Sequence, residues 1–322
     1  MSASEVLGSV IIPAHNEAAV IRRCLDALLS GFRPSELDVV VSCNACTDGT
    51  AEIVRSSGYP VRVVEIEMAS KTAAIRTAEQ LVSAFPRLYL DADVIVTSTA
   101  ARAVLECLRS GPAQAARPPI KYNTDSSAPI VRSYYRARSA VPALMGSLWG
   151  AGVYGLSAAG RARFGEFPEV TGDDLFVDQH FQRGEIAVVD APAAVVNVPR
   201  RTRDLVRIMR RINKGNTENR TLRTLPSEQS ATAPSTVREL VRLALSRPVK
   251  MLDVATYMVL AVVARVSLAI APAAAWERDN SSRSSEIPAE ELAGLPSGGQ
   301  VMTSIAAAPG PKYDGIDENS RG

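Results

Sequence analysis

The chain has few cysteines and almost no excess of one charge. Four cysteines in 322 residues argue against a disulfide scaffold and suggest a reducing compartment. Lysine and arginine (36) nearly balance aspartate and glutamate (34), so the net charge is only +2. Following nucleic-acid phosphates requires a clear cationic excess, and we therefore expect no nucleic-acid partner.

Signature motifs of several protein classes are also missing. No Gly-x-Gly-x-x-Gly of the dinucleotide type follows the first apolar run, no Walker phosphate loop occurs, and there is no Gly-x-Ser-x-Gly elbow. Cys43 and Cys46 form a lone Cys-x-x-Cys, and His15 and His180 are the only histidines, so a structural zinc site would lack ligands. Residues 1–8 lack the pattern of a signal peptide, and none is expected.

Apolar runs alternate with helical patterns over the first 95 residues. Strands are expected at residues 6–12, 37–41, 61–66 and 88–90. Helices are expected from residue 21, with Asn16 as the cap, and at about 51–56 and 71–84. The alternation predicts a doubly wound, parallel α/β sheet, with any ligand at the carboxyl ends of the strands.

Carboxylate pairs occur at two places. Asp91-Ala92-Asp93 follows an apolar strand, where two carboxylates can hold a divalent cation on a diphosphate, although such pairs also form ordinary turns. In Gly172-Asp173-Asp174, repulsion between adjacent acids raises one pKa, which suits a general base. The same acids could cap a helix, and both interpretations can hold together.

A basic helix face is predicted further on. Arg203, Arg207, Arg210 and Lys214 have helical spacing, and the opposite face is apolar. Such a face could grip a pyrophosphate, lie in solvent, or rest on anionic lipid.

The C-terminal part changes in composition. Residues 1–220 are predicted to form the α/β domain, 221–236 a linker, 237–280 basic amphipathic and apolar helices, and 281–322 a disordered tail. The apolar stretch 254–276, interrupted by Arg265 and Pro272, is long enough to cross a bilayer. Membrane association is favoured, and a buried helix covering the core is the alternative.

Five motifs, in this order, resemble those of family 2 glycosyltransferases. They comprise residues 10–17, 44–50, Lys71, 91–93 and 172–174, and the resemblance covers roughly residues 6–215. It implies the GT-A fold, a doubly wound, mixed but mostly parallel sheet. It also implies an inverting, hexosyltransferase-like enzyme that uses a nucleotide-sugar donor.

The resemblance implies roles for individual residues around the donor. The expected donor-binding residues are Pro13, Ala14, His15, Asn16, Glu17, Asn44, Asp48, Lys71, Asp91, Arg210 and Arg211. Asp93, with Asp91, would bind Mg²⁺ or Mn²⁺ on the diphosphate. Asp174, next to Asp173, would accept the proton of an acceptor hydroxyl. Trp149 and Tyr154 are expected to stack on the acceptor.

Two departures from the family pattern matter. Cys43 stands where the family often has an acid, so base recognition is expected to differ. The Gln/Arg-x-x-Arg-Trp element of processive synthases is missing, which favours the addition of one sugar per encounter.

The expected partners follow from the same resemblance. They are a UDP- or GDP-sugar donor and a glycan or lipid-linked acceptor. The expected location is cytoplasmic, at the inner face of the membrane, in the synthesis of cell-envelope polysaccharide or glycolipid. The alternatives are transfer to a polyprenyl phosphate and a non-catalytic nucleotide-binding scaffold. A sugar nucleotidyltransferase is disfavoured because its Gly-rich first loop is absent.

Overall fold

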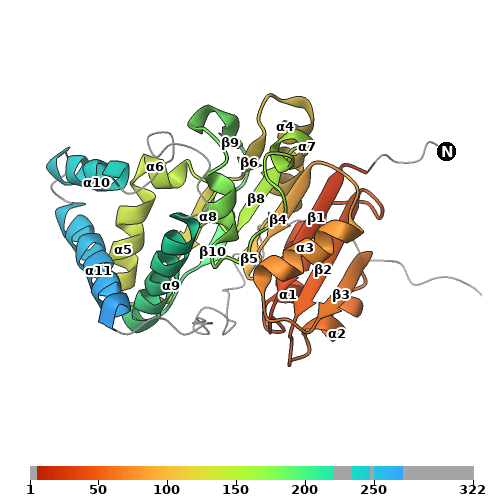
Figure 1. Ribbon diagram of the computed structural model, residues 1–322, viewed down its shortest axis with the longest axis horizontal. Coiled ribbons are helices and arrows are strands. Elements are labelled where there is room, and N and C mark those ends of the chain that lie inside the picture. Colours follow the sequence, from red (N-terminus) through yellow and green to blue (C-terminus); the bar gives the residue numbers. More distant parts are fainter. Residues whose placement is uncertain (1–5, 221–233, 247–249, 271–322) are drawn as a thin grey trace, which may run out of the picture. The chain divides into compact units, whose positions relative to one another are not determined.

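A seven-stranded sheet forms the centre of the first 200 residues (Figure 1). Its strand order is β3-β2-β1-β4-β8-β6-β9, and all neighbours are parallel except β8, which runs antiparallel to β4 and β6. The strands are β1 (Gly8–Ala14), β2 (Leu37–Asn44), β3 (Val61–Ile66), β4 (Arg87–Leu90), β6 (Ala115–Arg117), β8 (Val153–Leu156) and β9 (Ile186–Val188). The predicted mixed, mostly parallel α/β sheet is thus confirmed.

The computed structural model describes residues 6–220, 234–246 and 250–270, which belong to one compact unit. Three predicted segments lie wholly or partly outside the described residues. They are most of the linker, the whole tail and the last six residues of the apolar stretch 254–276. A second, small sheet has the order β5-β10-β7. Its strands are β5 (Val94–Ile95), β7 (Ile120–Asn123) and β10 (Ala194–Asn197).

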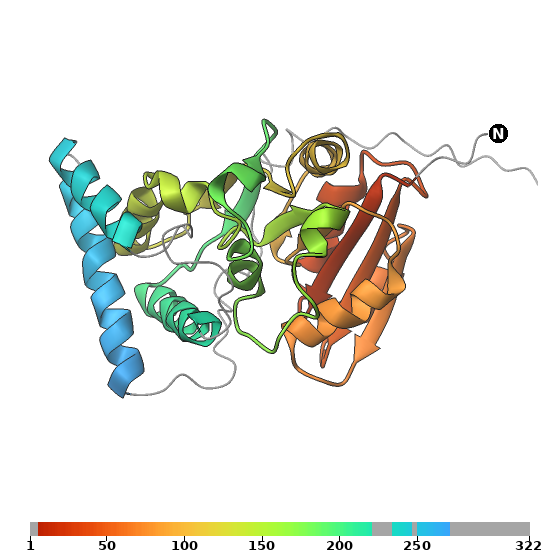
Figure 2. The ribbon, with the colours of Figure 1, turned by 45° about the horizontal axis from the view of Figure 1, so that its top comes forward.

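Helices cover both faces of the large sheet (Figures 1 and 2). Alternate residues of β1 point to opposite sides: Val10 and Ile12 pack with α1 and α4, whereas Ile11 packs with α3. The helices of this half are α1 (Ile21–Leu29), α2 (Thr50–Arg55), α3 (Lys71–Leu81), α4 (Ser98–Ser110), α7 (Ala158–Arg161), α8 (Asp173–Asp178) and the short 3-10 turn Arg183–Glu185.

Two boundaries near the first strand differ from the prediction. β1 continues through Pro13 because its pairing with β2 extends to Ala14, while its pairing with β4 ends at Ile11, so the proline has a paired strand on one side only. The prediction that Asn16 caps the first helix is wrong. That helix begins after Val20 without a side-chain cap, and the Asn16 side chain instead accepts a hydrogen bond from the Thr47 amide at 2.6 Å.

A group of helices lies beside the sheet on the left of Figure 1. It comprises α5 (Pro129–Ser139), α6 (Pro142–Met145), α9 (Thr202–Arg220), α10 (Pro234–Ser246) and α11 (Met251–Ile270). Tyr134 of α5 stacks on Tyr257 of α11 with ring centroids 4.8 Å apart. Asp253 accepts hydrogen bonds from Ser133 and Arg136, which ties α11 to α5. α11 also packs along α9.

α11 is apolar on two opposite faces but buried on only one. Val254, Leu260 and Ala264 are buried, whereas the opposite side, with Leu252 and Val259, is exposed. Among the described helices, only α11 is long and apolar enough to cross a membrane. The alternative, a helix that covers the core, accounts for the side packed on α5 and α9 but leaves the exposed apolar side without a cover.

Candidate active site

A cavity of about 470 Å³ lies where β1, β2 and β4 end, as expected for a ligand site of a parallel sheet. Its opposite wall comes from α5, the start of α8, and α9. The predicted site residues that line it are Pro13, His15, Glu17, Asn44, Lys71, Asp91, Asp93, Trp149, Asp173, Asp174 and Arg211. The topology therefore brings together segments that are up to about two hundred residues apart in the chain.

Five predicted site residues do not line this cavity: Ala14, Asn16, Asp48, Arg210 and Tyr154. Ala14 is buried in the sheet core. Asn16 and Asp48 tie the loops after β1 and β2 together, since Asn16 accepts a hydrogen bond from the Thr47 amide and Asp48 accepts one from the Ala18 amide. The prediction that Tyr154 stacks on an acceptor is wrong, because its ring is buried against Tyr89.

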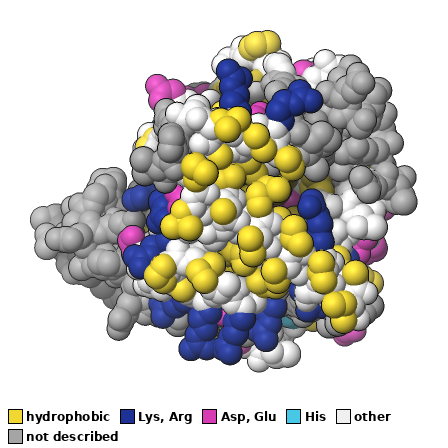
Figure 3. Space-filling view, turned by 90° about the vertical axis from the view of Figure 1, so that its left-hand side faces the viewer, with side chains coloured by type: hydrophobic (Ala, Val, Ile, Leu, Met, Phe, Trp, Pro, Cys, Tyr) yellow, Lys and Arg dark blue, Asp and Glu magenta, His cyan; other side chains and the backbone are white. Residues whose placement is uncertain are grey.

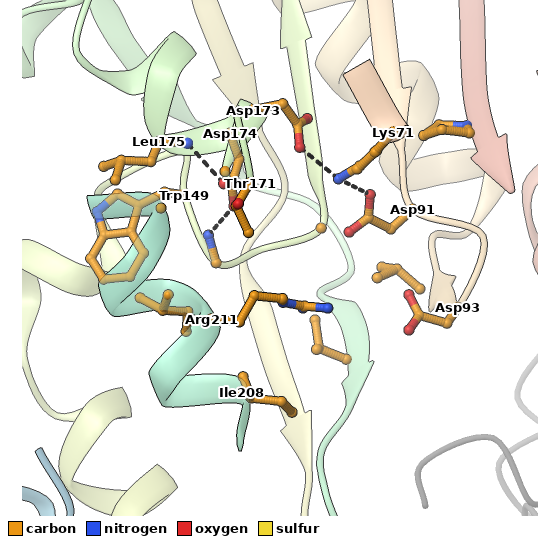
Figure 4. Close-up of a pocket in the computed structure, with 18 of the residues that line it drawn as sticks. Lys71, Asp91, Asp93, Trp149, Thr171, Asp173, Asp174, Leu175, Ile208 and Arg211 are labelled. Carbon is orange, nitrogen blue, oxygen red and sulfur yellow. Dashed lines mark hydrogen bonds and ion pairs between the residues drawn. The ribbon is translucent and has the colours of Figure 1, made fainter. Parts of the chain in front are cut away.

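Lys71 joins the two carboxylate motifs (Figure 4). Its Nζ lies 2.6 Å from Oδ1 of Asp91 and 2.8 Å from Oδ1 of Asp173. Burial disfavours the charged amine, but the nearby carboxylates outweigh it and raise the pKa of Lys71. Burial, together with Asp173 and Asp93, raises the pKa of Asp91 to about 6, although Lys71 opposes the shift. The lysine thus holds two acids from distant segments at one point.

Asp174 is held by backbone amides at the cavity wall (Figure 4). Oδ2 accepts a hydrogen bond from the Gly150 amide at 2.6 Å, and Oδ1 accepts one from the Leu175 amide at 2.8 Å. Burial and the charge of Asp173 nonetheless raise the pKa of Asp174. The result is an oriented carboxylate with increased basicity, which is what a general base requires.

Asp173 points toward Lys71 instead of toward the Gly150 amide, and it is buried. Besides Lys71, it accepts a hydrogen bond from the Tyr154 hydroxyl at 3.0 Å. Tyr154 stacks on Tyr89, whose hydroxyl donates to Glu79 at 2.6 Å. Tyr154 therefore supports the acid pair from behind.

Buried charges also anchor the loop that carries Trp149 and Gly150. Arg117 is fully buried and donates hydrogen bonds to the carbonyls of Met145, Ser147 and Pro118. From α8, Asp178 accepts a hydrogen bond from the Leu148 amide at 2.7 Å. These contacts fix the loop from which Gly150 reaches Asp174.

The residues at the end of β4 fit a divalent cation that arrives with a diphosphate. Asp91 and Asp93 both line the cavity, one residue apart. The described part of the chain contains no group of three His, Cys, Asp or Glu side chains that could hold a metal ion. Mg²⁺ needs no such group, since one or two carboxylates suffice when phosphate and water supply the other ligands.

α9 presents its apolar side to the cavity, and not the basic face. Arg203, Arg207, Arg210 and Lys214 do not line it, and Arg203 and Arg207 are largely exposed. The interpretation that this basic face grips a pyrophosphate is therefore wrong. α9 instead contributes to the cavity wall mainly Leu205, Ile208, Met209 and Ile212, together with its one cation there, Arg211. Figure 4 shows Arg211 extending from α9 toward the side of Asp93.

Glu169 and Arg138 are charged residues of the cavity wall that were not expected from the sequence. Glu169 accepts hydrogen bonds from Ser70 and Thr72 at the start of α3. Arg138 of α5 is only 5% exposed and lies over the Trp149 ring, 4.8 Å from its centroid. Neither belongs to a recognisable motif, and only the packing of distant segments brings them to the cavity.

The lone Cys-x-x-Cys and His180 lie outside the cavity and pack against other parts of the protein. Cys43 is buried at the end of β2 and Cys46 is partly buried, and both are free thiols. His180 packs between Phe164 and Phe176, and its Nδ1 hydrogen-bonds to the Phe176 carbonyl at 2.8 Å. None of the three lines the cavity.

Comparison with known proteins finds a family match in the N-terminal half of the chain. Residues 9–151 match the family model of glycosyl transferase family 2. Glycosyltransferase AglE of Haloferax volcanii is 39% identical over 90 residues, which make up 26% of this chain and 30% of that protein. The match thus spans less than a third of the relative's length.

A solved structure extends the likeness to most of the chain. Mannosyltransferase PcManGT from Pyrobaculum calidifontis, solved in complex with GDP-Man and Mn²⁺, superposes with a TM-score of 0.54 and 21% identity. The superposition covers 88% of this chain and 77% of that one. At this identity the likeness establishes the fold. Residues 9–151 are therefore similar to glycosyl transferase family 2, and the chain shares the GT-A fold of that mannosyltransferase.

Proposed function

We propose that the protein transfers a sugar from a nucleotide-sugar donor to a hydroxyl of a glycan or lipid-linked acceptor, with inversion at the anomeric carbon. The observation that carries the proposal is the placement of two acid pairs in the same cavity, Asp91/Asp93 at the end of β4 and Asp173/Asp174 at the start of α8. The first pair suits a cation on a diphosphate, and the second suits proton transfer.

Asp174 is the proposed general base. Its two backbone hydrogen bonds orient the carboxylate, and its raised pKa increases its affinity for a proton. It takes the proton of the acceptor hydroxyl while that oxygen attacks the anomeric carbon and the bond to the nucleoside diphosphate breaks. Asp173 positions Lys71 and does not itself reach the acceptor, since it is buried against Tyr154.

The donor is proposed to lie along the ends of β1, β2 and β4. His15, Glu17 and Asn44 line this side of the cavity, and His15 is oriented by the Asn44 carbonyl at 2.5 Å. Asp93 and Asp91 would hold Mg²⁺ or Mn²⁺ there. The cation would neutralise charge on the leaving diphosphate. Arg211, which extends toward the same side, would add a fixed positive charge.

We further propose that residues 1–220 form the catalytic domain and that α10 and α11 rest on the inner face of a membrane. Figure 3 shows a broad apolar area on this side, with lysine and arginine at its margins. We call this area the α10–α11 surface; its exposed apolar residues are Val237, Val241, Leu245, Met251, Leu252, Val259, Val262, Val263, Val266 and Ile270. The exposed Arg238, Arg242 and Arg265 suit anionic lipid. Because α11 packs lengthwise on α5 and α9, an in-plane position is favoured over a span.

The substitution Asp174→Asn tests the proposal. It keeps the shape and the hydrogen-bond acceptor of the side chain but removes the base, so we expect kcat to fall by about 100-fold or more. Asp26→Asn is the matched control, at a half-exposed carboxylate of α1 that pairs with Arg22 outside the cavity, and should leave the rate unchanged. Transfer from UDP- and GDP-sugars to membrane extract is the measurement.

The outcomes separate the alternatives. Full activity of Asp174→Asn would contradict a hydroxyl acceptor and favour a polyprenyl phosphate, which needs little help from a base. An inactive wild-type protein that still binds nucleotide would instead support the non-catalytic scaffold.

A further inference from the structure

The helix that carries Asp173 and Asp174 begins without a cap of its own. α8 starts after Gly172, which has a φ of −129° and a ψ of 85°, and no side chain caps the helix. Glycine has the greatest backbone freedom of all residues, so the chain does not fix the start of α8 locally. With six residues, α8 is also too short to be stable alone. Contacts with other segments therefore have to fix its first turn.

The last turns of α9 supply these contacts (Figure 1). The Asn219 side-chain amide donates a hydrogen bond to the Gly172 carbonyl at 3.1 Å. The Thr171 amide donates to a carboxylate oxygen of Glu218 at 3.0 Å. Gly215 packs against the same backbone, since a Cβ added to it would lie 3.5 Å from the Gly172 nitrogen. Two adjacent side chains of α9 thus hold two adjacent residues before α8.

Asn219 is buried although only half of its amide group is paired. The residue is 0% exposed, and its Oδ1 has no hydrogen-bond partner among the described residues. A buried polar atom without a partner destabilises the folded state, and such atoms are uncommon. A leucine of nearly the same shape would avoid this destabilisation. What the asparagine adds is therefore the hydrogen bond from Nδ2 to Gly172.

The Gly172 carbonyl determines where the first turn of α8 lies. It also accepts the amide of Phe176, which is a backbone hydrogen bond of the first turn. From this turn Asp174 reaches the Gly150 amide at 2.6 Å and the Leu175 amide at 2.8 Å. A shift of the turn would move the carboxylate with it, and a displacement of about 1 Å is enough to slow an enzymatic step strongly.

We propose that Asn219 is a positioning residue of the transfer reaction, which holds the Gly172 carbonyl and thereby keeps the carboxylate of Asp174 directed at the acceptor hydroxyl. The inference rests on the proposed transferase function. It adds a residue that belongs to none of the sequence motifs and does not line the cavity. Asn219 therefore acts on the chemical step through Asp174 and leaves the binding of nucleotide unaffected.

The substitution Asn219→Leu tests the inference, because it keeps the shape of the side chain and removes the hydrogen-bond donor. We expect kcat to fall by about 10-fold or more, while the KM for the donor and the affinity for nucleotide stay unchanged. Stability in urea should equal or exceed that of the wild type, since the unpaired oxygen is removed. Transfer from UDP- and GDP-sugars to membrane extract measures kcat, and calorimetry measures nucleotide binding.

A double variant decides whether Asn219 acts through the proposed base. In a protein that already carries Asp174→Asn, the change Asn219→Leu should cause no further loss of kcat. A second loss of the same size would show that the asparagine supports the site in general, and would overturn the proposal.

Thr217→Ala is the matched control on the same turn of α9. Thr217 is exposed, lies outside the cavity and donates a hydrogen bond to the Asn213 carbonyl of its own helix. Its removal should leave kcat unchanged. An equal loss in Thr217→Ala and Asn219→Leu would contradict a specific role of Asn219.

The outcomes separate this inference from the proposed function. Unchanged kcat in Asn219→Leu, or a loss that comes with weaker nucleotide binding, overturns the positioning role alone. Should Asn219→Leu not fold, Asn219→Ala also removes the donor and decides by the same measurements. Full activity of Asp174→Asn would instead contradict the proposed function, and the positioning role with it.

Discussion

Asp174 and Asp178 lie one turn apart on α8 and illustrate how surroundings assign roles to identical side chains. Asp174 lines the cavity and is held by two amides, whereas Asp178 is buried beneath the loop of Trp149 and accepts the Leu148 amide. Burial raises the pKa of Asp178 to about 6, with Asp174 adding to the shift. One acid is therefore available for chemistry, and the other holds a loop.

The raised pKa of Asp178 predicts how the stability of the folded protein depends on pH. A carboxyl group whose pKa is about 6 when folded, against an ordinary 3.8, binds a proton more tightly in the folded state. Its protonation stabilises the fold fully below about pH 4, and this contribution is lost as the pH rises through 6. Two pKa units correspond to roughly 3 kcal/mol.

Asp178→Asn removes this dependence and can still accept the Leu148 amide. We expect its free energy of unfolding, relative to wild type, to rise by roughly 3 kcal/mol between pH 4 and pH 7. Urea unfolding of both proteins at several pH values is the measurement. A difference that does not vary with pH would show that Asp178 is not the group that titrates.

At the scale of single elements, α9 shows that a helical pattern does not specify which face of the helix points to the cavity. The spacing of its basic and apolar residues predicts a helix, and Thr202–Arg220 is one. The helix turns Leu205 and Met209 inward, because burying apolar side chains against α5 and α11 is more favourable than burying charges. The basic face is consequently left outside the cavity.

A substitution on α11 tests the proposed binding to a membrane. Val259→Glu places a charge at the centre of the α10–α11 surface, at a side chain that is 60% exposed, so folding should be unaffected. We expect binding to vesicles that contain anionic lipid to fall by about 10-fold or more, since apolar burial is replaced by charge repulsion. Cosedimentation with the vesicles measures this binding.

Val188→Glu is the matched control, because Val188 is also exposed, at 41%, but belongs to β9. It should bind vesicles as the wild type does. Equal binding of both variants, or binding that is indifferent to salt and to anionic lipid, would contradict the in-plane arrangement.

At the scale of the whole molecule, the cavity lies between two differently built halves. The sheet with α1 to α4 supplies acids at its strand ends, and the helices α5 and α9, against which α11 packs, supply an apolar wall with Arg138 and Arg211. A nucleotide would contact mainly the first half and an acceptor mainly the second. Ligand binding should therefore stabilise the assembled molecule.

Nucleotide binding provides the prediction at this scale. One of UDP, GDP, CDP and dTDP, with Mn²⁺, should stabilise the protein by about 2.7 kcal/mol at 100 times its dissociation constant. For a domain of about 200 residues this is a rise in melting temperature of roughly 5–10 °C. Asp93→Ala should abolish the part of this stabilisation that depends on Mn²⁺. If no nucleotide changes the melting temperature, the nucleotide-sugar proposal fails.

The sequence by itself determined the alternating strands and helices and the family resemblance, because strand and helix periodicity is local and the motifs are contiguous. It also placed Asp91 and Asp93 at the site, since parallel strands end at one edge of a sheet, and the resemblance added Lys71 and Asp174. Small errors arose where pairing with a neighbouring strand extended an element, as at Pro13.

Only the tertiary structure decided which side chains face the cavity. Tyr154 is in the core, the basic face of α9 points elsewhere, and Arg138 reaches the cavity from a helix without any motif. These outcomes depend on the burial of side chains by segments distant in the chain. Burial also sets the pKa values of the acids, because desolvation depends on every neighbour in space.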